Sequence, residues 1–291
     1  MSARTSDPPV LCRPAHPRDR EAVMEFLQDI WEGRDYVPDV WDQWLLEEPG
    51  LLAVAERGGE IVGQGHLLDL GFGEWWLEGL RVRPSAQGQG IGSHLHDYFV
   101  ERWLNTGDTV VRLATHVHRD SVHKMCERTG FERICGFVLT TAEPLEDKEQ
   151  SAFQSAADEP VEALVDRLRG SDTVKAFGGL MNLGWRFARL QPDRLVGERA
   201  PSRWRWRSGE GLLLVLRGRL EPDASVEVSA LDAAPDEIPP LLLDLRRWAA
   251  AQQVAEVVWL APMEAPYPDL ARAAGFEVEE DDRLYIYERL R

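Results

Sequence analysis

Three glycines at alternate positions form the part of this sequence that most clearly predicts chemistry. They are Gly88, Gly90 and Gly92, and they stand between an expected strand and an expected helix. Glycine lets successive backbone N–H groups turn toward one centre, because no Cβ blocks the approach. The start of the helix adds a partial positive charge to the same place. The pattern therefore predicts a cradle for a pyrophosphate group.

The residues around these glycines exclude two other phosphate-binding motifs. The dinucleotide-binding pattern GxGxxG is absent, and no run of strand–helix–strand units precedes the loop. The nucleoside-triphosphate loop is excluded because no GK[ST] follows the glycines. An ordinary strand-to-helix turn remains the alternative to a phosphate cradle.

The apolar pattern predicts the elements that must position this loop. Residues 74–82 have the composition of a strand that Pro84 closes, and apolar residues at helical spacing follow the loop. Arg57, Gly58 and Gly59 predict a hairpin turn upstream. The other elements expected in the first half are strands at 10–15, 51–56, 60–70, 110–115 and 134–140 and helices at 19–31, 41–45 and 121–129.

The second half repeats part of this order. A proline follows the corresponding strand in both halves (Pro84 and Pro235), and a Gly-Phe-Glu sequence follows the last short helix in both (from Gly130 and from Gly275). A repeat of this length indicates a duplicated domain. The second copy has no glycine between Gly218 and Gly275, so we expect it to lack the phosphate cradle.

The run from Val82 to Pro84, followed by Gln87, Gly88, Gln89, Gly90, Ile91 and Gly92, resembles the [RQ]xxGx[GA] signature of the GNAT N-acetyltransferase superfamily. The resemblance covers the whole first half and implies an α/β (α+β) fold with two GNAT-like domains. Each would have a mixed, largely antiparallel central sheet flanked by helices. The expected divisions are a catalytic domain at 1–145, a linker at 146–158 and a degenerate domain without the phosphate loop at 159–291.

The resemblance also implies which residues bind acetyl-CoA. The segment 87–93 would cradle its pyrophosphate, and the backbone of three strand residues would pair with the pantetheine arm as an added strand does. The expected acetyl-CoA-binding residues are therefore Leu80, Arg81, Val82, Gln87, Gly88, Gln89, Gly90, Ile91, Gly92 and Ser93.

A carboxylate on the strand before the loop often removes the amine proton in this family, and Glu78 stands there. Strand alternation would place Glu74, Glu78, Leu80 and Val82 on one face if no bulge intervenes. Glu78 is the preferred candidate because it is nearer the loop. A solvated or ion-paired glutamate is the alternative role for this residue.

The proton donor to the departing thiolate is harder to assign. The family often uses a tyrosine four residues before the Gly-Phe pair, and here that position is Cys126. A family asparagine is replaced by Arg119. Cys126 is the candidate donor, with water or an inert buried cysteine as alternatives. His116 and His118, at the end of the strand before the last helix, are further candidate bases.

The acceptor is expected to be a small amine. Acidic and aromatic residues share the first two helices and would suit a cation, although tryptophans in a core under a solvated acidic face would give the same pattern. Residues 78–82, with 35–38 upstream, also resemble animal histidine N-acetyltransferases, which implies a small amino acid as acceptor. The residues of this rim are Asp29, Trp31, Glu32, Asp35, Tyr36, Asp39, Trp41, Asp42 and Trp44.

Composition excludes several other classes of protein. The net charge of −17 disfavours nucleic acid and anionic membranes, and no apolar run is long enough for a membrane helix. Three cysteines without a CxxC motif, and no Cys/His cluster, predict neither a disulfide framework nor a metal site. We expect a cytoplasmic, bacterial protein.

The sequence thus predicts an acetyl-CoA-dependent N-acetyltransferase that moves an acetyl group directly to the primary amine of a small molecule in a ternary complex. Two alternatives stay open: a non-catalytic acyl-CoA-binding sensor or scaffold, and a protein N-acetyltransferase. The second domain would shape the acceptor cleft or support a homo-oligomer.

Overall fold

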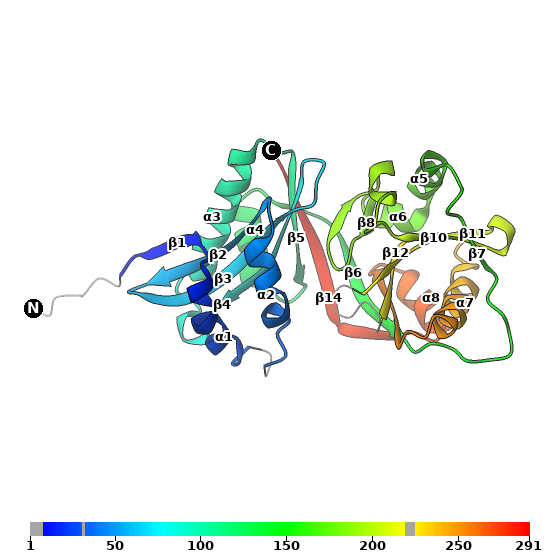
Figure 1. Cartoon of the computed structure of the whole chain (residues 1–291), viewed down its shortest axis with the longest axis horizontal. Helices are drawn as coiled ribbons and strands as arrows, with labels where there is room; N and C mark the ends of the chain where they lie inside the picture. Colours follow the sequence, from blue (N-terminus) through cyan, green and yellow to red (C-terminus); the bar gives the residue numbers. More distant parts are fainter. Residues whose placement is uncertain (1–7, 31–32, 219–224) are drawn as a thin grey trace, which may run out of the picture. The chain divides into compact units, whose positions relative to one another are not determined.

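The computed structural model describes residues 8–30, 33–218 and 225–291 (Figure 1). Its contacts divide the chain into two compact units. Unit 1 comprises Met1–Leu113, Ser121–Glu132 and Glu288–Arg291, and unit 2 comprises Ala114–Asp120 and Arg133–Tyr287. The last residues of the sequence therefore belong to the first unit. The predicted division at 1–145, 146–158 and 159–291 stays a prediction.

Unit 1 contains a mixed sheet with the strand order β1-β2-β3-β4-β5. The first four strands pair antiparallel, whereas β4 and β5 are parallel. The strands are β1 (Val10–Pro14), β2 (Gly50–Arg57), β3 (Glu60–Asp69), β4 (Glu74–Val82) and β5 (Val110–His116), and the helices are α1 (Arg20–Leu27), α2 (Val37–Leu46), α3 (Ile91–Thr106) and α4 (Asp120–Arg128).

Helices cover both faces of this sheet (Figure 1). A Cβ added at Gly65 would lie 2.8 Å from the Phe99 ring, so α3 packs directly on β3. On the other face, α1 and α2 bury Phe26, Trp41 and Trp44 against Leu52 of β2. Burial of such large apolar side chains contributes most of the stability of this unit.

A β-bulge interrupts the pairing of β3 with β4. Gln64 pairs with Arg81 and His66 pairs with Glu78, so β4 carries one residue more than β3 in this interval. Gly79 lies in the bulge with φ of +64°, a conformation that favours glycine. The bulge corrects the predicted alternation, because Glu78 and Arg81 now lie on the α1/α2 face. Leu80 and Val82 point to α3 instead, where their methyl carbons lie 3.5 and 3.7 Å from the Cβ position of Gly92.

The end of the chain completes unit 1 through a buried ion cluster. Arg112 of β5 is fully buried and forms salt bridges with Glu74 of β4 and, at 2.6 Å, with Glu288. Glu288 lies near the end of β14 (Glu277–Leu290), and Arg291 N donates to Thr109 O at 3.1 Å. A buried arginine needs such partners because an unpaired buried charge is strongly destabilising.

Unit 2 repeats the element order. Its sheet has the order β14-β6-β13-β12-β11-β10-β7, and β12 and β13 are parallel as β4 and β5 are. Helices α7 and α8 pack on one face and α5 and α6 on the other. Its elements are β6 (Glu132–Ala142), β7 (Phe153–Ser155), α5 (Val161–Gly170), α6 (Asp172–Ala176), β8 (Leu180–Asn182), β9 (Phe187–Arg189), β10 (Ser202–Trp206), β11 (Gly211–Arg217), β12 (Ser225–Asp232), α7 (Ile238–Ala251), β13 (Glu256–Pro262) and α8 (Tyr267–Ala273).

The predicted fold class, two α/β domains with largely antiparallel sheets between helices, is confirmed. Within the described ranges, no helix has the length and apolar character needed to cross a membrane.

Candidate functional site

Two of the three loop glycines have the left-handed backbone conformation, and the third, Gly92, lies in the first turn of α3. Gly88 and Gly90 have φ of +74° and +80°, and Gly90 is the N-cap of α3. The first bond of the helix runs from His94 N to Gly90 O at 3.1 Å. An α-helix leaves the N–H groups of its first turn without intrahelical acceptors, so Ile91, Gly92 and Ser93 present donors beside the loop. This arrangement can bind a phosphate group.

Side-chain amides brace the loop from outside. Gln87 Nε2 donates to Val82 O at 3.2 Å, and Gln89 Nε2 donates to Ser85 O at 3.0 Å. The Gln89 carbonyl oxygen accepts a short hydrogen bond from the Arg57 guanidinium. The loop thus has a fixed backbone and a cation close to it, and none of its residues from 87 to 93 is acidic.

The strand before the loop diverges from its parallel neighbour. β4 and β5 pair over three positions, from Glu74 with Val110 to Trp76 with Arg112. The pairing of the two strands ends at Trp76, and the backbone of Leu80–Val82 lies beyond this point, just before the glycine loop. An extended ligand with amide groups could bind there as an added strand.

Glu78 lies on β4 just before the bulge, on the α1/α2 face. Its Oε1 is 3.2 Å from His66 Nδ1. On the other side of the ring, His66 Nε2 is 3.7 Å from Glu47 Oε2. The His66 side chain is fully buried, the Glu78 side chain is 8% exposed and the Glu47 side chain is 20% exposed. A carboxylate in such a place can accept a proton from a bound amine.

The side chain of Arg81 points away from the predicted acetyl-CoA site. Its Nε donates to Asp35 Oδ2 at 2.6 Å, and its guanidinium lies 5.6 Å from the centre of the Tyr36 ring. Asp35 Oδ1 also accepts from Val37 N at 3.0 Å, so the pair fixes the start of α2 to β4. Arg81 can therefore contribute to an acetyl-CoA site through its backbone alone.

Some residues of the predicted acidic and aromatic rim are buried in the core, and others lie at the surface. Trp41 and Trp44 are in the core of unit 1, as the alternative interpretation held. Asp35 is buried beside Arg81, whereas Asp42 is exposed and pairs with Arg20 at 3.3 Å. Two further members of the predicted rim, Trp31 and Glu32, lie outside the described residues.

The other candidate residues lie in different surroundings. Cys126 of α4 is fully buried, and burial raises the pKa of its thiol to about 12. His116 Nδ1 is 3.4 Å from Asp282 Oδ1 in unit 2, with His118 beside it. In residues 8–30, 33–218 and 225–291, no group of three or more His, Cys, Asp and Glu side chains is placed to hold a metal ion.

Sequence reasoning missed His66 and Glu47. His66 stands in an apolar run that indicates a buried strand, and Glu47 ends α2 next to another glutamate. A histidine in a run of buried apolar residues is itself a signal, because a buried imidazole requires polar partners.

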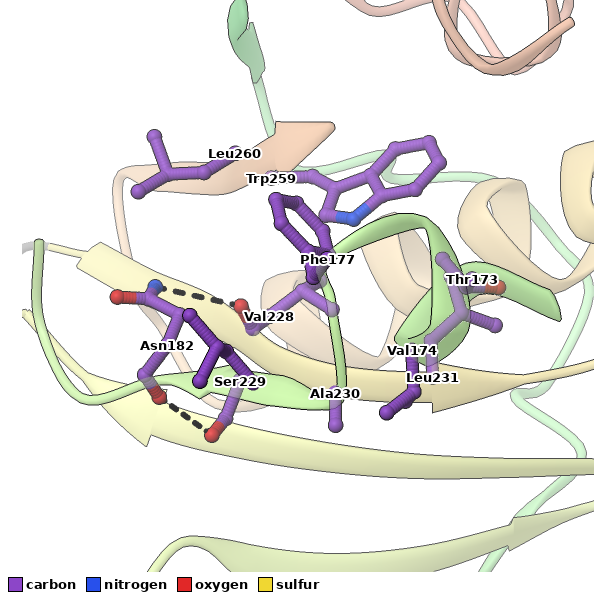
Figure 2. Close-up of a pocket in the computed structure, with 11 residues that line it drawn as sticks. Thr173, Val174, Phe177, Asn182, Val228, Ser229, Ala230, Leu231, Trp259 and Leu260 are labelled. Atoms are coloured by element: carbon purple, nitrogen blue, oxygen red, sulfur yellow. Dashed lines mark hydrogen bonds between the residues drawn. The ribbon is translucent and has the colours of Figure 1, made fainter. Parts of the chain in front are cut away.

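Unit 2 differs at the place that corresponds to the glycine loop. Pro239 and Pro240 stand in the first turn of α7, so two N–H donors are missing, and the acidic Asp236 and Glu237 precede them. Residues of α6, β8, β12 and β13 line a cavity of about 10 Å³, room for about one water molecule. Figure 2 shows Phe177 among the side chains that surround this cavity.

Comparison with known proteins finds a family match in the first half of the chain. Residues 20–131 match the acetyltransferase (GNAT) family model. A histidine N-acetyltransferase of Scomber australasicus is 33% identical over 78 residues, which are 26% of this chain and 23% of that protein. A probable N-acetyltransferase of Homo sapiens is 30% identical over 82 residues, 28% of this chain and 22% of that protein. The matched segments thus span about a quarter of the curated relatives.

Solved structures show the same two-domain fold. A GCN5-related N-acetyltransferase from Sphaerobacter thermophilus superposes with a TM-score of 0.63 at 16% identity, over 97% of this chain and 95% of that chain. A tandem GNAT protein from the clavulanic acid biosynthesis pathway gives 0.58 at 15% identity, over 97% of this chain and 98% of that one. The family match is thus to residues 20–131 of the chain, and the likeness to these solved structures is one of fold.

Proposed function

We propose that this protein is an N-acetyltransferase that moves the acetyl group of acetyl-CoA to the primary amine of a small molecule. The observation that carries the proposal is the continuity of three features along one stretch of chain. Glu78, the diverging edge of β4 and the glycine loop follow one another between residues 78 and 93. These features would serve, in order, the amine, the pantetheine arm and the pyrophosphate.

The residues present fit acetyl-CoA. Gly88 has no heavy atom within 4 Å of its Cβ position, and Gly90 has only the His94 ring near 3.8 Å, so a diphosphate can approach the backbone there. The donors of the first turn of α3 and the Arg57 cation would compensate its negative charge. Leu80 and Val82 would offer backbone groups to the amides of the pantetheine arm.

The transfer itself is a direct displacement. A neutral amine attacks the thioester carbonyl, the amine nitrogen loses a proton to Glu78, and the thiolate of CoA leaves and is protonated. A backbone N–H near Leu80 would stabilise the negative charge that develops on the thioester oxygen. Water or Cys126 would supply the proton for the thiolate. The burial and raised pKa of Cys126 favour water in this role.

The acceptor that we propose is the α-amino group of a small amino acid. Glu78 and Glu47 place negative charge on the α1/α2 face, which favours a cationic amine before it loses its proton. The curated relatives named histidine N-acetyltransferase support histidine as the first compound to test.

The experiment is a release assay for free CoA with acetyl-CoA and a panel of amines: histidine, other amino acids, polyamines and a peptide N-terminus. Turnover with a small amine would support the proposal. Turnover with the peptide alone would favour protein acetylation. Tight acetyl-CoA binding without turnover on any amine would favour the non-catalytic acyl-CoA-binding module, which the loss of the family tyrosine at Cys126 also suggests.

A further inference from the structure

We propose that Gln64 is the positioning residue for the backbone N–H of Leu80: it holds the carbonyl of the same peptide group and so directs this N–H toward the thioester oxygen of acetyl-CoA. The inference rests on the proposed function, because it assigns a supporting residue to the N–H that stabilises the developing negative charge.

Gln64 of β3 makes a short hydrogen bond to the bulge of β4. Its Nε2 donates to Gly79 O at 2.5 Å, and both groups are buried. A carbonyl oxygen can only accept, so the side-chain atom at this distance has to be the NH₂ group of the amide. The bond lies where the register between the strands shifts, between the pair Gln64–Arg81 and the pair His66–Glu78. A side chain thus holds the backbone of β4 at the interval where regular strand pairing is interrupted.

The carbonyl of Gly79 and the N–H of Leu80 belong to one peptide group. This peptide is trans, so its C=O and its N–H lie in one plane and point in opposite directions. Because the carbonyl faces Gln64 of β3, the N–H of Leu80 points away from it. The other neighbour of β4 is β5, and its pairing with β4 ends at Trp76. The bond to Gln64 therefore sets the direction of the Leu80 N–H.

Packing holds the same peptide on both faces of the sheet. A Cβ on Gly79 would lie 2.6 Å from the Trp44 ring, so α2 packs directly on the bulge. On the opposite face, the Cα of Leu80 lies 3.5 Å from the Cβ position of Gly65, and its methyl carbon lies 3.5 Å from that of Gly92. A donor that is fixed before the substrate arrives stabilises a developing oxyanion best, because it needs no reorganisation during the reaction.

The bond to Gln64 also strengthens the donor. A peptide whose carbonyl accepts a hydrogen bond becomes more polarised, and each bond in such a chain is strengthened by about 10–30%. The N–H of Leu80 is the donor of this polarised peptide. Gln64 thus acts on the orientation of the N–H and on its strength through one contact.

Packing alone does not account for a glutamine at this position. Gln64 is fully buried, and its amide oxygen has no hydrogen-bond partner among the residues that the structure describes. A buried acceptor without a donor is destabilising, whereas leucine or methionine would fill a similar volume without this loss. The bond to Gly79 O is the contact that an apolar residue could not make.

The kinetic test removes the donor with little change in volume. We expect Gln64→Leu to lower kcat at least about 10-fold, a part of the about 10²–10³-fold that one oxyanion donor contributes. The KM for acetyl-CoA should not change. The matched control is Thr140→Val in unit 2, because fully buried Thr140 donates to Trp259 O at 2.8 Å, a bond of the same kind. Equal kcat in wild type and Gln64→Leu, or the same loss in Thr140→Val, would overturn the proposal.

A second variant makes the contact depend on pH. In Gln64→Glu, the introduced carboxyl can donate to Gly79 O only while it is protonated. Burial raises the pKa of such a carboxyl from about 4.3, by up to about 3–5 units. The ratio of kcat in the variant to kcat in wild type should therefore be high at acid pH and fall as the carboxyl ionises. A ratio that is equally low at acid and alkaline pH, at equal folded fraction, would contradict the proposal.

A spectroscopic readout separates this proposal from the proposed function. Protein labelled with carbonyl-¹³C glycine and ¹⁵N leucine gives ¹³C–¹⁵N correlated signals from its Gly–Leu peptides, at 50–51, 79–80, 179–180 and 211–212. Gln64→Leu should move the signal of Leu80 and leave those of the two peptides in unit 2 in place. A wild type that turns over no amine contradicts the proposed function, whereas an unmoved Leu80 signal contradicts the positioning role whatever the activity.

Discussion

Glu78 is the residue on which the proposed chemistry depends. We expect Glu78→Gln to lower turnover by about 10²–10⁴-fold, because the amide cannot accept the amine proton. The affinity for acetyl-CoA should hardly change, since the side chain lies on the α1/α2 face and the glycine loop is elsewhere on the chain. Steady-state rates with a good amine acceptor check the loss of turnover. Calorimetric titration with acetyl-CoA checks that the affinity is unchanged. Near-normal turnover would move the base to Glu74, His116 or His118.

A substitution of Cys126 tests which group protonates the departing thiolate of CoA. A thiol with a pKa of about 12 is a weaker acid than an ordinary thiol, whose pKa is about 8.5, so it is a poor proton donor to a departing thiolate. We therefore expect Cys126→Ala to keep turnover within a few-fold of wild type at equal folded fraction. A loss of 10-fold or more in kcat, with the melting temperature unchanged, would instead assign the proton to Cys126.

His96 links the stability of unit 1 to pH. It is fully buried on α3 with Nε2 2.8 Å from Thr129 Oγ1, and burial lowers its pKa to about 4 from an ordinary 6.5. Between about pH 6.5 and pH 4 the His96 imidazole is protonated in the unfolded chain but neutral in the folded chain. Acidification through this window therefore favours unfolding, and the stabilisation present above pH 6.5 is lost, by about 3 kcal/mol at most.

The variant His96→Gln isolates this contribution. Glutamine can keep a hydrogen bond to Thr129 but does not titrate in this range. The free energy of unfolding, measured by urea denaturation at pH 7 and pH 4.5, should fall less in the variant than in wild type. Equal pH dependence in the two proteins would show that other groups cause the loss.

At the scale of elements, the proposed binding of acetyl-CoA depends on the turn between β4 and α3. Gly90→Asp would place a side chain and a negative charge in the phosphate cradle, and we expect calorimetry to detect no binding. Gly71→Asp is the matched control, because Gly71 also has a positive φ (+76°) and open space at its Cβ position, at the other end of β4. Unchanged affinity in folded Gly90→Asp would refute the cradle.

The segment around β4 shows which features of the site the sequence alone predicts and which it does not. The predicted strand at 74–82 coincides with β4, because its apolar alternation and the closing proline are local signals. The bulge reversed the predicted faces, although an isolated glycine at 79 in a strand is the usual sign of one. His66 and Glu47 could not be paired, since their contact depends on how α2 packs on β3, a tertiary arrangement that no local pattern encodes.

Elements outside the family motif were harder to predict. The run at 277–290 is rich in acidic residues, yet it forms the long strand β14. Its stability comes from strand pairing and from Arg112, which is distant in sequence. Likewise β7 falls within the stretch that was expected to be a linker, because three strand residues among polar neighbours carry too little pattern.

At the scale of the whole molecule, we expect one acetyl-CoA per chain. Unit 2 has proline in place of two N–H donors and acidic residues in place of the glycines, and the cavity beside β12 and β13 has room for about one water molecule. Calorimetric titration should therefore give a stoichiometry near one, and Gly90→Asp should abolish the whole signal. Two equivalent sites, or half of the signal remaining in the variant, would contradict the asymmetry.

The membership of Glu288–Arg291 in unit 1 has a consequence for biosynthesis. A ribosome adds about 5–20 residues per second, so the partner of Arg112 emerges roughly ten to thirty seconds after Arg112 itself. Until then the nascent first unit holds an arginine with one of its two carboxylates missing. Completion of unit 1 therefore has to wait for the synthesis of unit 2, and a gene truncated at the apparent domain boundary would encode a first unit without Glu288.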